Sequence, residues 1–260
     1  MSPGPPTLSL PASIRPSASR SITIPTAGIS VVPEPIDLTY WWSLFNETAC
    51  HDRADRFTLL CVCRFYPRKR LSLLLDAIAL LPQLLPQTAI VLRIVGNGPE
   101  HDRLHAHARS LNLGASCQFS GDLDIHELAS EYQNCDAFVF PSAQEGFGIV
   151  LLEAMAAGKP IIATRSAAIP EVVPHALFAA SDSPEDLARA ITRLSTDEHL
   201  QRNLARRSRQ RVKQFDASRV ARQFIELIQN KLALSTALAP REAAFSIADE
   251  STSIGRGIAG

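Results

Sequence analysis

Two carboxylates eight residues apart, Glu145 and Glu153, are the side chains most able to do chemistry in this chain. Glu153 lies within an apolar run from Ile149 to Ala157, a composition typical of a helix buried between layers. A charge in such a helix is costly unless another group binds it. Two explanations are open: Glu153 forms an ion pair with Lys159 or Arg165, or it binds a ligand.

The loop between the two acids has the composition of an anion site. Gly146, Phe147 and Gly148 directly precede the apolar helix, so their backbone N–H groups should be free at a helix N-terminus. Glycines that only shape a turn are the alternative. Carboxylates that accept from hydroxyls, beside N–H groups that donate to phosphate, favour a sugar nucleotide as the ligand.

A basic turn follows the first predicted strand, in the sequence CRFYPRKR. Arg64, Arg68, Lys69 and Arg70 place four cations within seven residues. Guanidinium and ammonium groups at the end of a strand can neutralise a diphosphate. A solvated basic turn is the competing interpretation.

The elements that must position these groups alternate between strand and helix. The patterns predict strands at 57–64, 89–95, 117–119, 137–140 and 160–164, and helices at 70–81, 99–111, 125–132, 149–157, 184–194, 197–211 and 217–234. Pro82 is expected to end one helix and Pro99 to begin the next. This order predicts an α/β fold with a single Rossmann-like, doubly wound parallel sheet and a helical C-terminal end. Ligands of such sheets bind beyond the carboxyl ends of the strands, where the groups above lie.

The chain divides into four predicted parts. Residues 1–28 are a Pro/Ser-rich tail expected to be disordered, and 29–56 form a linker-like segment. Residues 57–234 form the domain, and 235–260 form a flexible tail.

Composition excludes several classes of protein. The 260 residues carry no formal net charge, which gives no reason to expect a nucleic-acid partner, and no apolar stretch approaches the length of a membrane span. The five cysteines have neither metal-ligand nor disulfide-framework spacing, which predicts a reducing, cytoplasmic location.

Three other polar clusters have an ordinary explanation beside a functional one. His101 and His105 could form a metal pair, although no third ligand is evident and a solvent-facing position is favoured. Asp124 and Glu127 predict a helix capping box rather than a metal-binding Asp-x-Asp. The basic stretch 202–213 could contact anionic lipid at the cytosolic face of a membrane, or it could be a solvated helix face.

Several ordered motifs resemble the C-terminal, donor-binding domain of the family 4 retaining glycosyltransferases (glycosyl transferases group 1), which have the GT-B fold. The motifs are RFYPRK, VGNGPE, FSGDL, Y-x₂-CDAFVFPS and EGFGIVLLEAMAAGKP, and the similarity covers about residues 29–234. Glu145 and Glu153 match the family's E-x₇-E element. The resemblance implies a nucleotide-diphosphate sugar donor (UDP, GDP or ADP), with no cofactor and no metal.

The resemblance also implies roles for individual residues. The catalytic residues are Glu145, Arg64 and Lys69. Glu145 would contact the donor sugar, and Arg64 and Lys69 would hold the diphosphate. The remaining residues would line the sugar, ribose and base: Gly96, Phe119, Gly121, Gly146, Phe147, Gly148, Ile149, Val150 and Glu153. Of these, Glu153 would bind the ribose hydroxyls.

The sequence departs from the family pattern in two ways. Cys63 and Arg70 stand where a glycine often occurs, so the basic turn is expected to be altered. About 55 residues precede the domain, too few for the first half of a GT-B enzyme. A separate N-terminal glycosyltransferase domain is therefore an expected partner, and the C-terminal helix, lacking it, should expose apolar residues around 224–228.

A non-catalytic nucleotide-sugar-binding or scaffolding module is the alternative function, and a sugar-nucleotide epimerase of the same fold is ranked last.

Overall fold

The computed structural model describes residues 30–48 and 56–238, with 232–238 described by their backbone alone. The predicted tail at 1–28 lies outside the described residues, as does the predicted tail at 235–260 from residue 239 onward, whereas residues 235–238 are helical. The strands are β1 (Arg56–Val62), β2 (Ala89–Val95), β3 (Cys117–Gly121), β4 (Ala137–Phe140), β5 (Ile161–Ala163) and β6 (Leu177–Phe178). The helices are α1 (Leu38–Glu47), α2 (Leu71–Leu84), α3 (His101–Ser110), α4 (Ile125–Asn134), α5 (Ile149–Ala156), α6 (Ile169–Val172), α7 (Pro184–Thr196), α8 (Glu198–Val212) and α9 (Ala217–Leu238).

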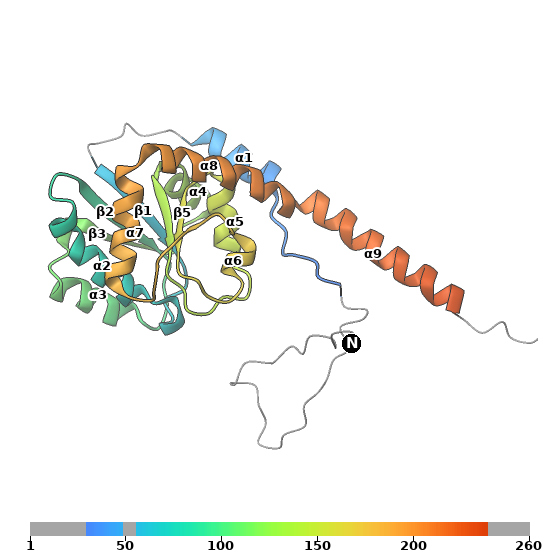
Figure 1. The fold of residues 1–260 in the computed structure, drawn as a ribbon, viewed down its shortest axis with the longest axis horizontal. Helices are drawn as coiled ribbons and strands as arrows, with labels where there is room; N and C mark the ends of the chain where they lie inside the picture. The colour runs from blue at the N-terminus through green and yellow to red at the C-terminus, as the bar shows by residue number, and fades with distance from the viewer. Residues whose placement is uncertain (1–29, 49–55, 239–260) are drawn as a thin grey trace, which may run out of the picture.

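The six strands form one parallel sheet in the order β3-β2-β1-β4-β5-β6 (Figure 1). The chain reverses its direction of winding between β1 and β4, which are neighbours in space. In open α/β sheets the ligand crevice lies at such a reversal, beyond the carboxyl ends of the strands. The predicted doubly wound sheet is confirmed.

Apolar runs explain why β1, β4 and β5 form the centre of the sheet. Every residue of β4 and β5 is buried, as is every residue of β1 after Arg56. Strands covered on both faces lose their alternation and become continuously apolar. Helix α5 is buried as predicted except at its start, where Ile149 is 51% exposed.

Two predicted helix boundaries were wrong for reasons visible in the backbone. Pro82 lies inside α2, because the helix loses only the bond of that one missing N–H and continues to Leu84, after which the capping Leu85 donates its N–H to Leu81 O at 2.7 Å. Helix α3 begins two residues after Pro99, because the N–H of Glu100 donates to Phe65 O at 3.1 Å and holds the turn against the loop after β1.

The segment predicted as linker-like contains helix α1, which the sequence analysis did not anticipate. Leu38, Trp41, Leu44 and Phe45 of α1 are buried, and the helix packs against α4 and α5. An Asp37 cap begins the helix by accepting from Tyr40 N at 2.9 Å. Residues 38–47 therefore belong to the folded body.

Helix α9 extends away from the body of the domain (Figure 1). Phe224 and Ile225 are each 52% exposed and Ile228 is 42% exposed, whereas Leu227 is partly buried. The expected apolar patch on the C-terminal helix is present and consists of Phe224, Ile225 and Ile228.

Candidate functional site

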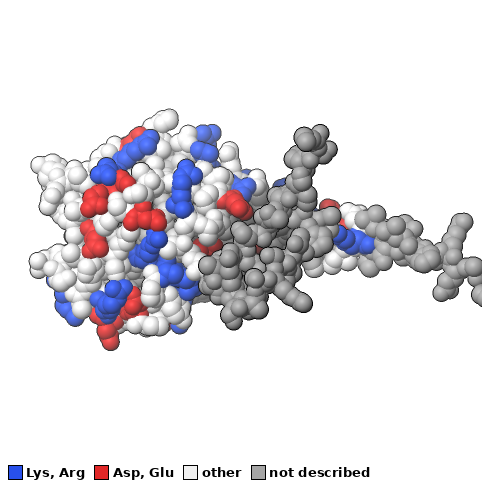
Figure 2. All heavy atoms as spheres, turned by 60° about the horizontal axis from the view of Figure 1, so that its bottom comes forward, with Lys and Arg blue, Asp and Glu red and all other residues white. Residues whose placement is uncertain are grey.

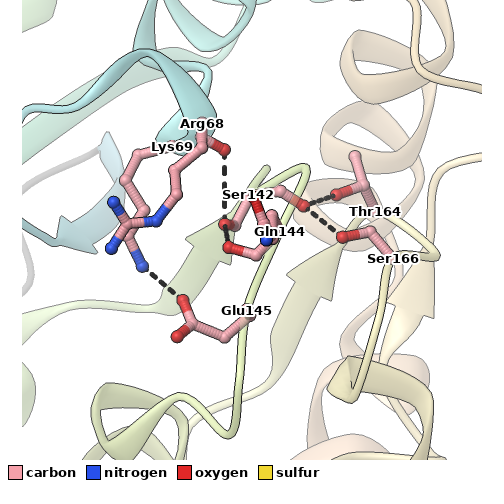
Figure 3. A network of polar contacts seen from close by, with 7 residues as sticks. All are labelled: Arg68, Lys69, Ser142, Gln144, Glu145, Thr164 and Ser166. Carbon is pink, nitrogen blue, oxygen red and sulfur yellow. Dashed lines mark hydrogen bonds and ion pairs between the residues drawn. The ribbon is translucent and has the colours of Figure 1, made fainter. Parts of the chain in front are cut away.

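The two residues at the centre of the predicted site come from different strands and contact each other. Lys69, after β1, forms an ion pair with Glu145, after β4 (Figure 3). Both side chains are largely buried, at 10% and 15% exposure. The Lys69 ammonium also lies 5.0 Å from the centre of the Phe140 ring, a cation–π contact. The structure thus joins a predicted diphosphate cation to the predicted sugar carboxylate.

Ser142 ties the loop that carries Glu145 to its neighbours. Its carbonyl accepts from Thr164 Oγ1 at 2.9 Å and from Ser166 Oγ at 2.8 Å, both after β5 (Figure 3). The next residue, Ala143, donates its N–H to Arg68 O at 2.8 Å. Three strand ends are joined through this network, which fixes the position of Glu145 against the basic turn.

Sequence reasoning missed Ser142 and Thr164 as supports of the site. Both side chains are buried, at 0% and 1% exposure, and each of their hydroxyls donates to a backbone carbonyl. Ser142 could have been predicted from its place in the FVFPS motif, where a hydroxyl comes two residues after the end of a buried strand.

The start of α5 has the geometry expected of an anion site. Gly148 precedes the helix with a φ of 86°, a left-handed conformation that a residue with a Cβ rarely adopts. The N–H groups of Gly146, Phe147 and Gly148 donate to no other group within the described residues. The exposed Ile149 and the partly buried Val150 form the first turn behind them.

The residues predicted to line the nucleotide lie close together, with Gly96 just after β2 and with Phe119 and Gly121 inside β3. The N–H of Gly96 donates to Gly121 O at 2.7 Å, and the ring of Phe119 meets Phe65 edge-on at 6.2 Å. A Cβ at Gly96 would lie 2.1 Å from Cys63 O, so only glycine allows this close approach to the end of β1.

The altered basic turn contains a non-glycine residue in a glycine conformation. Arg70 has a φ of 53°, in the left-handed region, at the position where the resembling family often has glycine. Its guanidinium forms an ion pair with Asp182 at 2.6 Å. Arg64 is exposed and has no ion pair within the described residues.

Within the part of the chain that the structure describes, Glu153 is bound by a phenol and not by a cation. Tyr132 Oη, on α4, donates to Glu153 Oε2 at 2.7 Å. Lys159 instead donates to the carbonyls of Gln133 and Cys135, both at 2.8 Å. The Arg165 guanidinium lies over the Phe178 ring at 4.5 Å. The interpretation in which Glu153 forms an ion pair with Lys159 or Arg165 is therefore wrong.

Burial sets the ionisation of this acid. It raises the pKa of Glu153, and the hydrogen bond from Tyr132 opposes that rise. The same burial and the neighbouring Glu153 raise the pKa of Tyr132 well above its ordinary value, so its hydroxyl stays a donor. Tyr132 is the tyrosine of the Y-x₂-CDAFVFPS motif, but the sequence assigned it no role at the site.

The other polar clusters have structural roles. Asp124 and Glu127 form the predicted capping box of α4. The expected solvent-facing position holds for His101, whose side chain is 45% exposed, but not for His105, whose ring stacks on Phe119 at 4.1 Å. Within residues 30–48 and 56–238, no group of three or more His, Cys, Asp or Glu could hold a metal ion.

On the face drawn in Figure 2, basic and acidic side chains are interspersed. Beside the basic turn, a cavity of about 300 Å³ is lined by Tyr66, Arg70, Glu100 and Arg103, but not by Glu145 or Glu153. It therefore lies next to the candidate site and is not the site itself.

Among the described helices, none is both long and apolar enough to cross a membrane.

Solved structures of other proteins have a similar fold. Sucrose-phosphate synthase from Thermosynechococcus elongatus aligns with a TM-score of 0.65 and 29% identity, over 79% of this chain and 53% of that one. HepE of Anabaena, solved in complex with UDP and glucose, aligns with a TM-score of 0.65 and 22% identity, over 77% of this chain and 57% of that one.

Sequence comparison gives a consistent result. Glycogen synthase of Mycobacterium tuberculosis is 34% identical over 200 residues, which are 75% of this chain and 47% of the relative. The chain thus spans about half the length of the curated relatives it matches. The family model "Glycosyl transferases group 1" matches residues 50–211 and includes the Lys69–Glu145 pair and Glu153. On this match and the geometry of the site, the chain belongs to the glycosyl transferases group 1 family.

Proposed function

We propose that this chain is the donor-binding half of a retaining, metal-independent glycosyltransferase that uses a nucleotide-diphosphate sugar. The observation that carries the proposal is the convergence of Lys69, Glu145 and the free amides before α5 at the reversal between β1 and β4. One cation, one carboxylate and several N–H donors match a diphosphate that is attached to a hydroxyl-rich sugar.

In the proposed reaction, the bond between the sugar C1 and the diphosphate oxygen breaks while the acceptor oxygen bonds to C1 from the same face. The acceptor's proton passes to the leaving diphosphate. Lys69, Arg64 and the amides of Gly146 to Val150 stabilise the negative charge that grows on the diphosphate. Each such donor typically contributes about 3 kcal/mol to lowering a barrier.

Glu145 and Glu153 have separate proposed roles. Glu145 accepts from hydroxyls of the donor sugar, and Glu153 accepts from ribose hydroxyls. Gly96, Phe119 and Gly121 lie along the nucleoside, whose base we propose to be uracil, guanine or adenine. Ligand hydroxyls at Glu153 would offset the cost of a buried carboxylate that no cation compensates.

Isothermal titration calorimetry with UDP-, GDP- and ADP-sugars tests the proposal. At least one donor is expected to bind to the wild type, and binding is expected to weaken strongly in both Glu153→Ala and Lys69→Ala. The matched control is Lys213→Ala, which removes an exposed lysine with no ion pair in the described residues. Equal heats for the wild type and the two site variants would contradict the proposal.

A non-catalytic nucleotide-sugar-binding or scaffolding module is the second candidate function. It would use the same donor-binding groups, Lys69, Glu145 and Glu153, for binding alone. Hydrolysis or transfer of a bound donor by the purified chain would exclude it.

A separate N-terminal glycosyltransferase domain is the partner we propose for α9. The exposed Phe224, Ile225 and Ile228 give that domain an apolar surface to cover. A hydrophobic dye should bind the wild-type chain and bind less to Phe224→Ser. A chain that binds no dye would count against an available surface.

A cytoplasmic location, with contact to the cytosolic face of a membrane through α8, completes the proposal. Arg206, Arg209 and Lys213 of this region are exposed and have no ion pair in the described residues. Cosedimentation with vesicles of acidic phospholipid, but not of phosphatidylcholine, is the expected result.

A further inference from the structure

Glu153 is held in a fixed orientation from outside its own helix. Its carboxylate receives one hydrogen bond, at 2.7 Å, from the Tyr132 hydroxyl of α4. That hydroxyl also lies 3.3 Å from Val150 O, in the first turn of α5. Because helical side chains lean toward the N-terminus of their helix, the carboxylate lies level with that first turn, on the side of the phosphate-binding loop.

The tyrosine has little freedom to move. Its side chain is fully buried, and the Trp41 ring of α1 packs edge-on against it at a centroid distance of 5.9 Å. The Phe138 ring of β4 lies 5.8 Å away on another side. A rigid ring places its hydroxyl at one point, so Tyr132 can select one rotamer of Glu153.

The hydrogen bond uses only one of the two carboxylate oxygens. Oε2 accepts from Tyr132, whereas Oε1 accepts no hydrogen bond within the described residues. A carboxylate has about four lone-pair sites, so one oxygen and part of the other stay open. An aimed, partly free carboxylate suits the paired hydroxyls of a ribose.

We propose that Tyr132 is a positioning residue that fixes Glu153 to bind the 2′- and 3′-hydroxyls of a nucleoside diphosphate and so to distinguish ribose from its deoxy forms. This inference rests on the proposed function. Tyr132 itself touches no ligand: it acts through Glu153, and Trp41 supports its ring. The N-terminal helix α1 thereby becomes part of nucleotide recognition although it lies outside the residues predicted to form the domain.

The test compares UDP with 2′,3′-dideoxy-UDP, and GDP with its dideoxy form if UDP does not bind. Wild type should prefer the ribonucleotide by roughly tenfold or more, as expected for hydrogen bonds to a charged group. Tyr132→Phe removes only the hydroxyl. It should weaken UDP binding by roughly fivefold to tenfold, leave dideoxy-UDP binding unchanged, and so remove most of the preference.

Controls separate positioning from general damage. Tyr40→Phe makes the same change on an exposed tyrosine of α1, and it should keep both affinities. Lys69→Ala should weaken both nucleotides alike and keep the preference. In a Glu153→Ala background, Tyr132→Phe should have no further effect on the preference, because Tyr132 acts only through that carboxylate.

A folded Tyr132→Phe protein that keeps the full preference for UDP would overturn the inference. If Tyr132→Phe does not fold, Glu153→Asp gives a second test, because it withdraws the carboxylate from an intact Tyr132. An unchanged preference in Glu153→Asp would likewise overturn it. A wild type that binds no nucleotide at all would overturn the proposed function instead, and inorganic pyrophosphate binding would then show whether the loop still holds an anion.

Discussion

The loop after β4 and the helix that follows it each carry a glutamate, and the two glutamates have different kinds of partner. In the loop, Glu145 is neutralised by Lys69, a cation from another strand end. In α5, Glu153 has no cation in the described residues and receives a neutral hydroxyl from Tyr132. Both acids are shielded from water, so the difference lies in their partners.

The charges of the two acids are compensated to different extents. An ion pair compensates the charge of Glu145, at the cost of occupying the cation expected to bind phosphate. A single phenol compensates Glu153 only in part, which is why burial still raises its pKa. Lys69 and Glu145 must exchange a partner when a ligand binds, whereas Glu153 keeps one carboxylate oxygen without a hydrogen bond in the described residues.

The largest effect is expected from Lys69→Ala. It removes a buried cation from the diphosphate and leaves Glu145 without its partner, so UDP affinity should fall about 100-fold and the free energy of unfolding by about 3 kcal/mol. Calorimetry and urea denaturation measure the two quantities.

The double variant Lys69→Ala/Glu145→Gln separates these two losses. It should recover most of the stability, since no unpaired charge remains, but none of the affinity. Recovery of UDP binding in the double variant would show that Lys69 acts only by neutralising Glu145.

Glu145→Gln alone tests whether the ion pair competes with the ligand. Freed from its carboxylate, Lys69 should bind free UDP a few times more tightly, while transfer from a UDP-sugar should fall. A loss of UDP affinity as large as that of Lys69→Ala would instead mean that Glu145 is needed to position the lysine.

The pH dependence of stability tests Glu153. Because its pKa is raised in the folded protein, the fold holds this proton more tightly than the unfolded chain, so its contribution is most favourable below about pH 4 and is lost as the pH rises toward 7. Glu153→Gln does not titrate. The unfolding free energy of Glu153→Gln minus that of wild type should therefore increase between pH 4 and pH 7. A difference that does not change with pH would mean that burial does not perturb the acid.

The smallest effect is expected at Arg70. Arg70→Gly relieves a left-handed residue by about 1 kcal/mol and removes an ion pair with Asp182 that is worth about 0.5 kcal/mol, since Asp182 is half exposed. A melting temperature one or two degrees above wild type is expected, with UDP affinity unchanged. A clear loss of stability would show that the Asp182 pair outweighs the strain.

Much of the fold could be predicted because its patterns are local. The largely apolar segments 89–95 and 137–140 predicted the bounds of β2 and β4, and the lone acid in the apolar helix marked α5. Helix α1 was missed because its apolar residues become meaningful only against α4 and α5, which lie far away in the sequence. The short α6 and β6 carry too few residues to show a period.

The sequence by itself determined which residue types stand after which strands, and therefore the two carboxylates, the basic turn and the glycine-bearing loop. Only the tertiary structure decided their partners. Lys69 and Glu145 are 76 residues apart, and Tyr132 and Glu153 are 21 apart on different helices. The spacing of residues along a strand or helix fixes the face they occupy, but contacts between elements depend on how the whole sheet is ordered and packed.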